Sequence, residues 1–301
     1  MTLSGPIILV IVLASWMLLL SLAAALIIHP NLGTAIKTNH GQTPTDFITA
    51  LYVGGSSLSF IGASDFFPEN GFFRFFYLFT SLIGISLASL IVTYLMELYG
   101  NLKERNALGL QVHLLSAETG DAAEVVSHLG PQGQFENGYN NIVDWAAETA
   151  KVRESHHFYP ILLFFRFREP FYSVSRSTLT SLDTITLIKS ALDDKEFGWL
   201  KESAAVNDLW RGSMLELKTL GQDLLPKMKF DIPPDAKTRT LWQRRYEMAV
   251  QRFEEAGIKT TQAGAEKYVQ LRTQWDRYIY ELAPTFAYDM NEIDTVLAKL
   301  K

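Results

Sequence analysis

Two long apolar stretches with a shorter amphipathic one between them make up most of the first hundred residues. Residues 6–28 carry no charge, and 23 such residues at about 1.5 Å each cross a hydrocarbon core of about 30 Å. Residues 72–98 have Arg74 and Glu97 only near their ends, so their apolar interior is again about as long as a bilayer is thick. The pattern predicts two transmembrane helices.

The first apolar stretch has an alternative interpretation as a cleaved signal peptide, because the small residues at 23–25 could form a cleavage site. No Lys or Arg precedes the stretch, and it is longer than the usual core of a signal peptide. We therefore favour a membrane helix.

Residues 45–59 predict a short helix between the two spans, with Thr45 as N-cap and an apolar side formed by Phe47, Ile48, Leu51, Tyr52 and Leu58. Its length of about 22 Å is too short to cross a bilayer. A half-length helix followed by a glycine-containing loop at 60–68 is typical of a re-entrant pore loop. Because non-helical backbone at membrane depth must be buried in protein or line water, such a loop implies a homotetramer or similar assembly. An ordinary extracellular loop is the alternative.

The loop sequence FIGASDFFP resembles the filter motif T-V-G-Y-G-D-x-x-P of two-transmembrane pore-loop channels related to bacterial potassium channels. The filter-like positions are Phe60, Ile61, Gly62, Ala63, Ser64 and Asp65. Gly62, Asp65 and Pro68 match the motif, whereas Phe60, Ala63 and Ser64 depart from it. The resemblance implies four pore loops around one axis.

The second span also keeps landmarks of that family. The resemblance implies an arginine shortly after the loop proline and a glycine hinge midway along the inner helix, and Arg74 and Gly84 stand in those positions. Gly84 would equally suit close packing between helices. The residues spaced four apart around it are candidates for pore lining or gating: Ile83, Leu87 and Ile91. A stripe that faces lipid or a neighbouring helix is the alternative.

The departures from the motif change the expected selectivity. A potassium filter coordinates ions with stacked carbonyl oxygens, on a backbone that uses glycine at left-handed positions. Ser64 stands at one of those positions, Ala63 removes a bracing aromatic ring, and Phe60 replaces a hydroxyl. We expect weak or absent potassium selectivity. Either Asp65 forms an acidic ring that favours monovalent cations, or Phe60 closes a hydrophobic constriction.

Residues 101–301 follow helical spacing nearly throughout, so the whole chain is expected to be all-α. The predicted helices are 119–129, 141–157, 178–204, 205–225, 235–256 and 260–283, with Thr119 capping the first and Gly257 after the fifth. Lys103 and Arg105 directly follow the second span, which predicts a plasma (inner) membrane protein with both termini cytoplasmic and 101–301 as a cytoplasmic domain.

Several side chains in this domain invite a functional interpretation. His156 and His157 are adjacent, a poor spacing for one metal ion, and a structural role is favoured. The run 161–167 is too short to span a bilayer and is expected in the core or against the membrane surface. His157, Leu162, Phe165 and Arg166 resemble a string in bacterial two-helix channel homologues. Helix caps and solvated faces are the expected roles of Asp183, Asp193 and Asp194.

Composition excludes several classes of function. A net charge of −5 and a pI near 5.7 give no basic surface for nucleic acid. The chain has no cysteine and hence no disulfide or thiolate zinc site, and it has no catalytic motif, so we expect no enzyme, metal or cofactor. The expected function is a membrane ion channel subunit with an unknown ligand or partner for its cytoplasmic domain. The alternative is a non-conducting membrane sensor or scaffold that retains a degenerate channel frame.

Overall fold

The structure, a computed structural model, describes residues 4–39, 41–59, 62, 65–230 and 232–300. This part of the chain is mostly helical, in line with the predicted all-α class. It divides into two compact units, one ending at Tyr99 and the other beginning at Gly100. Each unit is described by itself.

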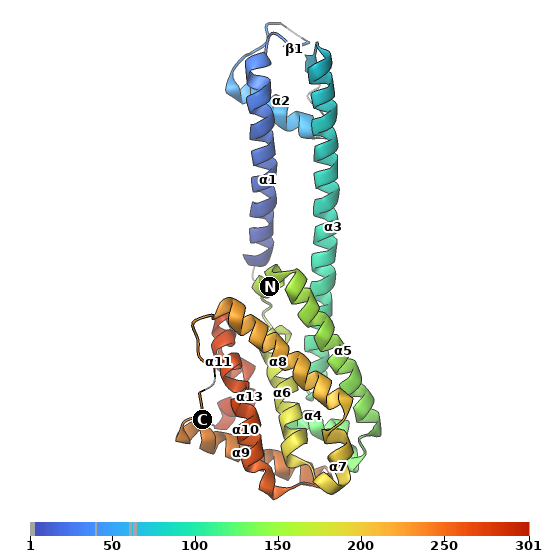
Figure 1. Ribbon diagram of the computed structural model, residues 1–301, viewed down its shortest axis with the longest axis vertical. Helices are drawn as coiled ribbons and strands as arrows, with labels where there is room; N and C mark the ends of the chain where they lie inside the picture. The colour runs from blue at the N-terminus through green and yellow to red at the C-terminus, as the bar shows by residue number, and fades with distance from the viewer. Residues whose placement is uncertain (1–3, 40, 60–61, 63–64, 231, 301) are drawn as a thin grey trace. The chain divides into compact units, whose positions relative to one another are not determined.

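The first unit contains two long helices and a short one. They are α1 (Ser4–Ile28), α2 (Phe47–Leu58) and the first part of α3 (Gly71–Leu115), and Figure 1 shows α2 crossing between the other two. By length and composition α1 and α3 could each cross a bilayer, and little of their apolar surface is buried within the chain. A core helix of a soluble protein would be mostly buried, so these two helices suggest membrane association.

The short helix begins two residues later than expected. Asp46, not Thr45, is its N-cap, and the Asp46 carboxylate accepts hydrogen bonds from the Thr49 backbone N–H at 2.9 Å and from its hydroxyl at 2.7 Å. A carboxylate that binds both groups satisfies one of the unpaired N–H groups of the first turn and also favours the positive end of the helix dipole.

Two short strands modify the all-helical prediction. β1 (Ile36–Thr38) and β2 (Phe66–Pro68) pair antiparallel, with Ile36 opposite Pro68 and Thr38 opposite Phe66. The prediction that the loop continues to residue 68 is therefore wrong for its last three residues. Aromatic side chains suit a half-buried strand, and here the pairing partner lies about thirty residues earlier in the chain.

The helix α3 continues without a break beyond the predicted membrane span 72–98 and ends at Leu115. Residues 99–115 contain no proline, and Leu, a good helix former, occurs there five times. The charges after Leu98 therefore mark the expected passage from lipid to water, whereas the backbone stays helical.

The second unit is a helical domain. Its helices after α3 are α4 (Ala122–Leu129), α5 (Glu136–Phe158), α6 (Val174–Ala191), α7 (Asp194–Lys201), α8 (Ala204–Leu224), α9 (Ala236–Glu255), α10 (Ala265–Thr273), α11 (Asp276–Thr285), α12 (Met290–Ile293) and α13 (Thr295–Leu300). The 3-10 turns Pro160–Phe164 and Pro170–Tyr172 join α5 to α6. Three predictions are corrected. Asp121 replaces Thr119 as the first cap, 178–204 is divided at the Asp193 cap, and 260–283 is divided at Trp275.

The central element of this unit is α6, which is buried on nearly all sides although it is rich in Ser and Thr. Several of its hydroxyl groups donate to carbonyl oxygens four residues earlier, as Thr180 does to Arg176 at 3.0 Å and Thr186 to Leu182 at 2.6 Å. Because these polar atoms are satisfied within the helix, a polar sequence can occupy the core.

Candidate functional site

Small residues hold α2 closely between the two long helices. A β-carbon at Gly54 would lie 2.8 Å from the Ala25 backbone nitrogen of α1, and one at Gly84 of α3 would overlap the carbonyl oxygen of Leu58. Leu58 is the last residue of α2. The contact of α2 with α1 and its contact with α3 therefore each depend on a glycine, because any larger side chain would push the helices apart.

The chain leaves β1 after Thr38 and enters β2 at Phe66, and these two residues lie opposite each other in the ladder. Beyond the paired residues, the Asn39 N–H donates to the Asp65 carbonyl oxygen at 2.9 Å, and Lys37 forms an ion pair with Glu69 at 2.9 Å. Between these contacts the chain runs through α2, whose twelve residues extend about 18 Å. The segment 40–64, called the excursion below, therefore connects two residues, Asn39 and Asp65, that are hydrogen-bonded to each other.

The filter-like loop is described only in part, because Phe60, Ile61, Ala63 and Ser64 lie outside the described residues. Gly62 has a φ of +67°, a left-handed conformation that glycine adopts at little cost, and its N–H donates to the Ser59 hydroxyl at 3.3 Å. Asp65 accepts a hydrogen bond from the Tyr52 hydroxyl of α2 at 3.4 Å. The matching Pro68 accepts from Arg74 Nε at 3.3 Å through its carbonyl oxygen.

The predicted inner-helix residues lie on α3, and one of them contacts α2. Ile83, Leu87 and Ile91 are half-buried in the single chain, whereas Gly84 is buried against Leu58. The helix continues as an α-helix through Gly84. The structure thus gives this glycine a packing contact, and its role as a hinge stays a prediction.

An apolar face of α2 is left uncovered by its own chain. Ile48 is 79% exposed, and Phe47 and Tyr52 are also exposed. Apolar side chains at this density on a short helix are typical of surfaces that another subunit or lipid covers.

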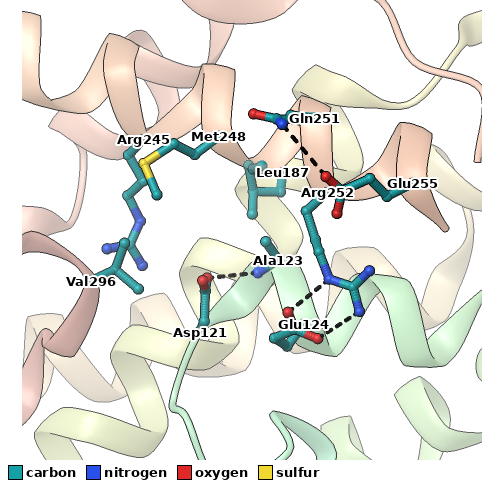
Figure 2. Close-up of a pocket in the computed structure, with 11 residues that line it drawn as sticks. Asp121, Ala123, Glu124, Leu187, Arg245, Met248, Gln251, Arg252, Glu255 and Val296 are labelled. Carbon is teal, nitrogen blue, oxygen red and sulfur yellow. Dashed lines mark hydrogen bonds and ion pairs between the residues drawn. The ribbon is translucent and has the colours of Figure 1, made fainter. Parts of the chain in front are cut away.

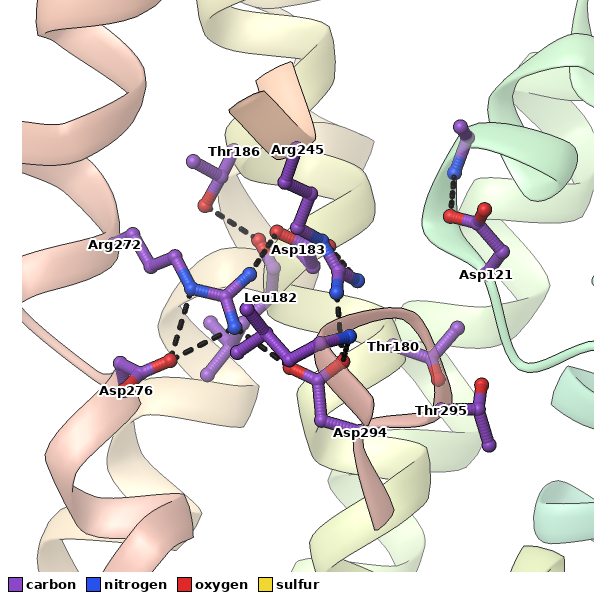
Figure 3. Close-up of polar contacts among 12 residues, drawn as sticks. Asp121, Thr180, Leu182, Asp183, Thr186, Arg245, Arg272, Asp276, Asp294 and Thr295 are labelled. Carbon is purple, nitrogen blue, oxygen red and sulfur yellow. Dashed lines mark hydrogen bonds and ion pairs between the residues drawn. The ribbon is translucent and has the colours of Figure 1, made fainter. Parts of the chain in front are cut away.

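The second unit contains a buried charge cluster that the sequence interpretation missed (Figure 3). Asp183 of α6 binds Arg245 of α9 at 2.5 and 2.9 Å and Arg272 of α10 at 3.0 Å. Asp294 binds the same two guanidinium groups at 2.7 and 2.8 Å, and Arg272 also reaches Asp276 at 2.8 Å. The prediction that Asp183 is a cap or a solvated residue is wrong, since its side chain is 0% exposed.

The cluster consists of three carboxylates and two guanidinium groups. Burial raises the pKa of Asp294, but the charges of Arg245 and Arg272 outweigh that effect and lower it to about 2. Burial likewise raises the pKa of Asp276, which Arg272 only partly offsets. Arg272 also stacks over the Trp275 ring, with 4.8 Å from Cζ to the ring centroid. Such a fully paired cluster fixes which helices meet more than it adds net stability.

Beside the cluster lies an open cavity of about 270 Å³ (Figure 2). Arg252 and Glu124 form a bidentate pair in its wall at 2.7 and 2.9 Å, and this hydrogen bonding lowers the pKa of Glu124. Asp121 faces the same space with a pKa that burial raises. Charged groups of both signs alternate here with Leu187, Met248 and Val296.

The two predicted histidines have different surroundings. His156 is buried between α5 and α8, and its Nδ1 lies 2.6 Å from Glu216 Oε1, whereas His157 is exposed. The partner that the sequence did not reveal is therefore a glutamate sixty residues away. Within the ranges that the structure describes, no group of three or more His, Asp or Glu side chains could hold a metal ion.

The other predicted aspartates behave as expected from sequence. Asp193 caps α7 through the N–H groups of Lys195 and Glu196, and Asp194 is exposed and pairs with Lys201 at 2.8 Å. The signal that distinguishes Asp183 is its position in the middle of a helix, where the side chains from Ser177 to Ile188 are otherwise short or apolar, a context that requires a buried partner.

Comparison with known proteins gives no identification: no family model, no curated protein and no solved structure matches the chain.

Proposed function

We propose that this chain is a subunit of a membrane ion channel with potassium-channel architecture, homotetrameric, in the plasma membrane with both termini cytoplasmic. The observation that carries the proposal is the excursion 40–64. A helix of about 18 Å, too short to cross a bilayer, lies between two helices that are long enough, and the chain pairs with β1 from Phe66 onward.

Further features of the first unit support the same proposal. Gly62 is in the left-handed conformation that a filter backbone needs at such a position, and Asp65 is held by Tyr52 of the short helix. The uncovered face of α2 at Phe47, Ile48 and Tyr52 would be covered by neighbouring subunits in a tetramer. The permeant ion in this proposal is a monovalent cation, with weak potassium selectivity because Phe60, Ala63 and Ser64 replace filter residues.

The test is ion flux into liposomes that contain the purified full chain. We expect flux of monovalent cations above that of empty liposomes, and single-channel reversal potentials in a potassium gradient well short of the Nernst value. A reversal potential at the Nernst value would refute the weak-selectivity part alone.

A second function is favoured by one specific substitution, the phenylalanine at position 60 where the family's filter has a hydroxyl. Four such rings around an axis could block conduction and leave a membrane sensor or scaffold. The Phe60→Thr variant distinguishes the two functions. Flux in the variant alone indicates a plug at this position, whereas silence of both proteins towards cations and anions at several pH values would exclude the channel.

A further inference from the structure

Arg105 is a buried cation in the unit that begins at Gly100, and no described carboxylate lies within ion-pair distance of it. It is 5% exposed, and its two terminal nitrogens donate to the carbonyl oxygens of Leu162 at 2.6 Å and Phe165 at 2.8 Å. Carbonyl oxygens satisfy hydrogen bonds but bring no opposite charge, and burial lowers the pKa of Arg105 to about 10. A buried arginine normally has an anionic partner.

A small cavity lies beside this guanidinium. Its volume is about 20 Å³, and Arg105, Arg166, Ser173 and Tyr288 are among the residues that line it. All of them belong to the same unit. One water-sized sphere needs about 10–15 Å³, so the cavity has room for one water molecule or one monatomic ion and is too small for phosphate or sulfate.

Two polar atoms in the cavity wall have no hydrogen-bond partner among the described residues. They are Nε of Arg105 and the hydroxyl of Ser173, and the Ser173 side chain is 3% exposed. The arginine Nε–H can only donate, and the serine hydroxyl can donate by rotating. Because buried polar groups in folded proteins are almost always satisfied, these two donors require an acceptor.

The amino end of α6 supplies further donors at the same cavity. Ser173 is the N-cap of this 18-residue helix, but its hydroxyl makes no capping hydrogen bond. Val174, the first residue of the helix, also lines the cavity. The first N–H groups of a helix have no partner within it and lie at the positive end of its dipole, which favours an anion.

The charged side chains around the cavity are all positive. Arg166 lines it as a second guanidinium, with its Cζ 4.8 Å from the centroid of the Tyr288 ring, and no Asp or Glu is among the described lining residues. The Tyr288 hydroxyl is already engaged, since it accepts from the Phe167 N–H at 3.3 Å and donates to the Phe167 carbonyl oxygen at 3.2 Å. An acceptor for Arg105 and Ser173 must therefore come from a bound ligand.

We propose that Arg105, Arg166 and Ser173 form a binding site for a monatomic halide, with chloride as the common one. The uncompensated positive charge favours an anion over a water molecule, and the volume favours a halide over an oxyanion. The bound ion joins the Arg105 side chain of α3 to the amino end of α6. This site does not depend on the proposed channel.

The test uses the full-length chain in detergent, with sodium chloride replacing sodium gluconate stepwise at constant ionic strength. The line width of the chloride NMR signal reports binding, and the Tm reports stabilisation by the bound ion. Ser173→Ala removes the unpartnered hydroxyl. Ser175→Ala is its matched control, because the Ser175 hydroxyl is also buried and without a described partner but does not line the cavity. Arg166→Gln is compared with Arg211→Gln, which is exposed on α8.

We expect a saturable chloride-dependent change of line width and a Tm that rises with chloride in the wild-type protein. The Kd for chloride should increase about tenfold or more in Ser173→Ala, because a hydrogen bond to a charged group is lost. Binding should be lost in Arg166→Gln, whereas Ser175→Ala and Arg211→Gln should bind as wild type does.

Three outcomes would overturn the proposal. No saturable effect of chloride over gluconate would mean that a water molecule serves as the acceptor. Equal Kd values in Ser173→Ala and Ser175→Ala would place any bound chloride elsewhere on the chain. Tighter binding of sulfate than of chloride would exclude a site built for a monatomic ion. None of these measurements involves ion flux, so failure of this site leaves the test of the proposed channel unaffected.

Discussion

The carbonyl oxygen of Leu58, at the end of α2, lies where a β-carbon on Gly84 of α3 would be. Gly84, which the sequence suggests as a hinge, therefore allows the end of α2 to approach α3 closely. Since Leu58 is followed directly by the filter-like loop, the position of that loop depends on a contact made by a glycine backbone.

This contact predicts a large effect of Gly84→Ala. The added methyl group must displace the end of α2, so we expect a loss of about 1–3 kcal/mol in the free energy of unfolding of the detergent-solubilised chain. Gly100→Ala is the control, because it lies on the same helix with open space around it. That control should be stabilising by up to about 1 kcal/mol, as alanine is the better helix former. Equal effects of the two substitutions would contradict the packing role of Gly84.

The position of Asp65 predicts an effect on conduction that depends on salt. In the proposed tetramer four carboxylates surround the mouth of the pore and concentrate cations. Asp65→Asn should reduce single-channel cation conductance at low ionic strength and have little effect near 1 M salt, where the Debye length is about 3 Å. Tyr52→Phe removes the 3.4 Å hydrogen bond and retains the charge. The salt dependence should therefore survive in Tyr52→Phe, and its loss there would argue against a simple charge effect.

The buried cluster predicts a severe effect of Asp183→Asn. Arg245 and Arg272 would lose the carboxylate that both of them bind, and breaking a buried ion pair by removing one partner costs about 3–5 kcal/mol. Chemical denaturation measured by tryptophan fluorescence should report this loss. The exposed Asp208→Asn is the matched control and should change the free energy of unfolding by less than about 0.5 kcal/mol. A change of that small size in Asp183→Asn as well would mean that the cluster is not formed in solution.

The lowered pKa of Asp294 predicts acid sensitivity. Its pKa is about 2 in the folded chain against a reference value of 3.8, so its ionised form favours the folded state above pH 3.8. This contribution, about 2 kcal/mol, should be lost as the pH falls from about 4 towards 2. Asp276 has a raised pKa, so its protonation favours the folded state and partly opposes the loss.

Unfolding free energies measured across that pH range test the assignment. In Asp294→Asn the chain should be less stable at neutral pH and should lose less stability in acid than wild type. A parallel pH profile in the two proteins would assign the acid sensitivity to other groups.

The hydrogen bonds from Arg105 of α3 to the carbonyl oxygens of Leu162 at 2.6 Å and Phe165 at 2.8 Å predict an effect of Arg105→Leu. Burial lowers the pKa of Arg105 to about 10, so the guanidinium is charged at neutral pH and both carbonyl oxygens accept from a cation. Removing it takes the charged donor away from both carbonyl oxygens, at about 1–3 kcal/mol. Hydrogen exchange should then accelerate within residues 159–172 and less elsewhere in the domain. Lys103→Leu, on the exposed side of the same turn of α3, should leave the exchange of that segment unchanged.

The sequence alone determined the features that depend on local pattern. Long apolar runs with few charges predict α1 and the first part of α3, and their length matches a bilayer. The helix end at Gly257 also follows from local chemistry, since its φ of +73° is one that glycine adopts easily. The break before α9 agrees with the proline-rich segment there, and Asp235 caps the helix.

Only the tertiary structure decided which distant groups meet. Nothing in the spacing of residues pairs Ile36 with Pro68, joins Asp183 to Arg245 and Arg272, or places Leu58 against Gly84. The local pattern of apolar and polar residues determines whether a segment favours helix or strand and which of its sides is buried. The partner that a given residue contacts depends on how whole helices and strands pack together. For this reason the sequence indicated the excursion at 40–64 by its length and composition, and the contacts that hold it in place became visible only in the folded chain.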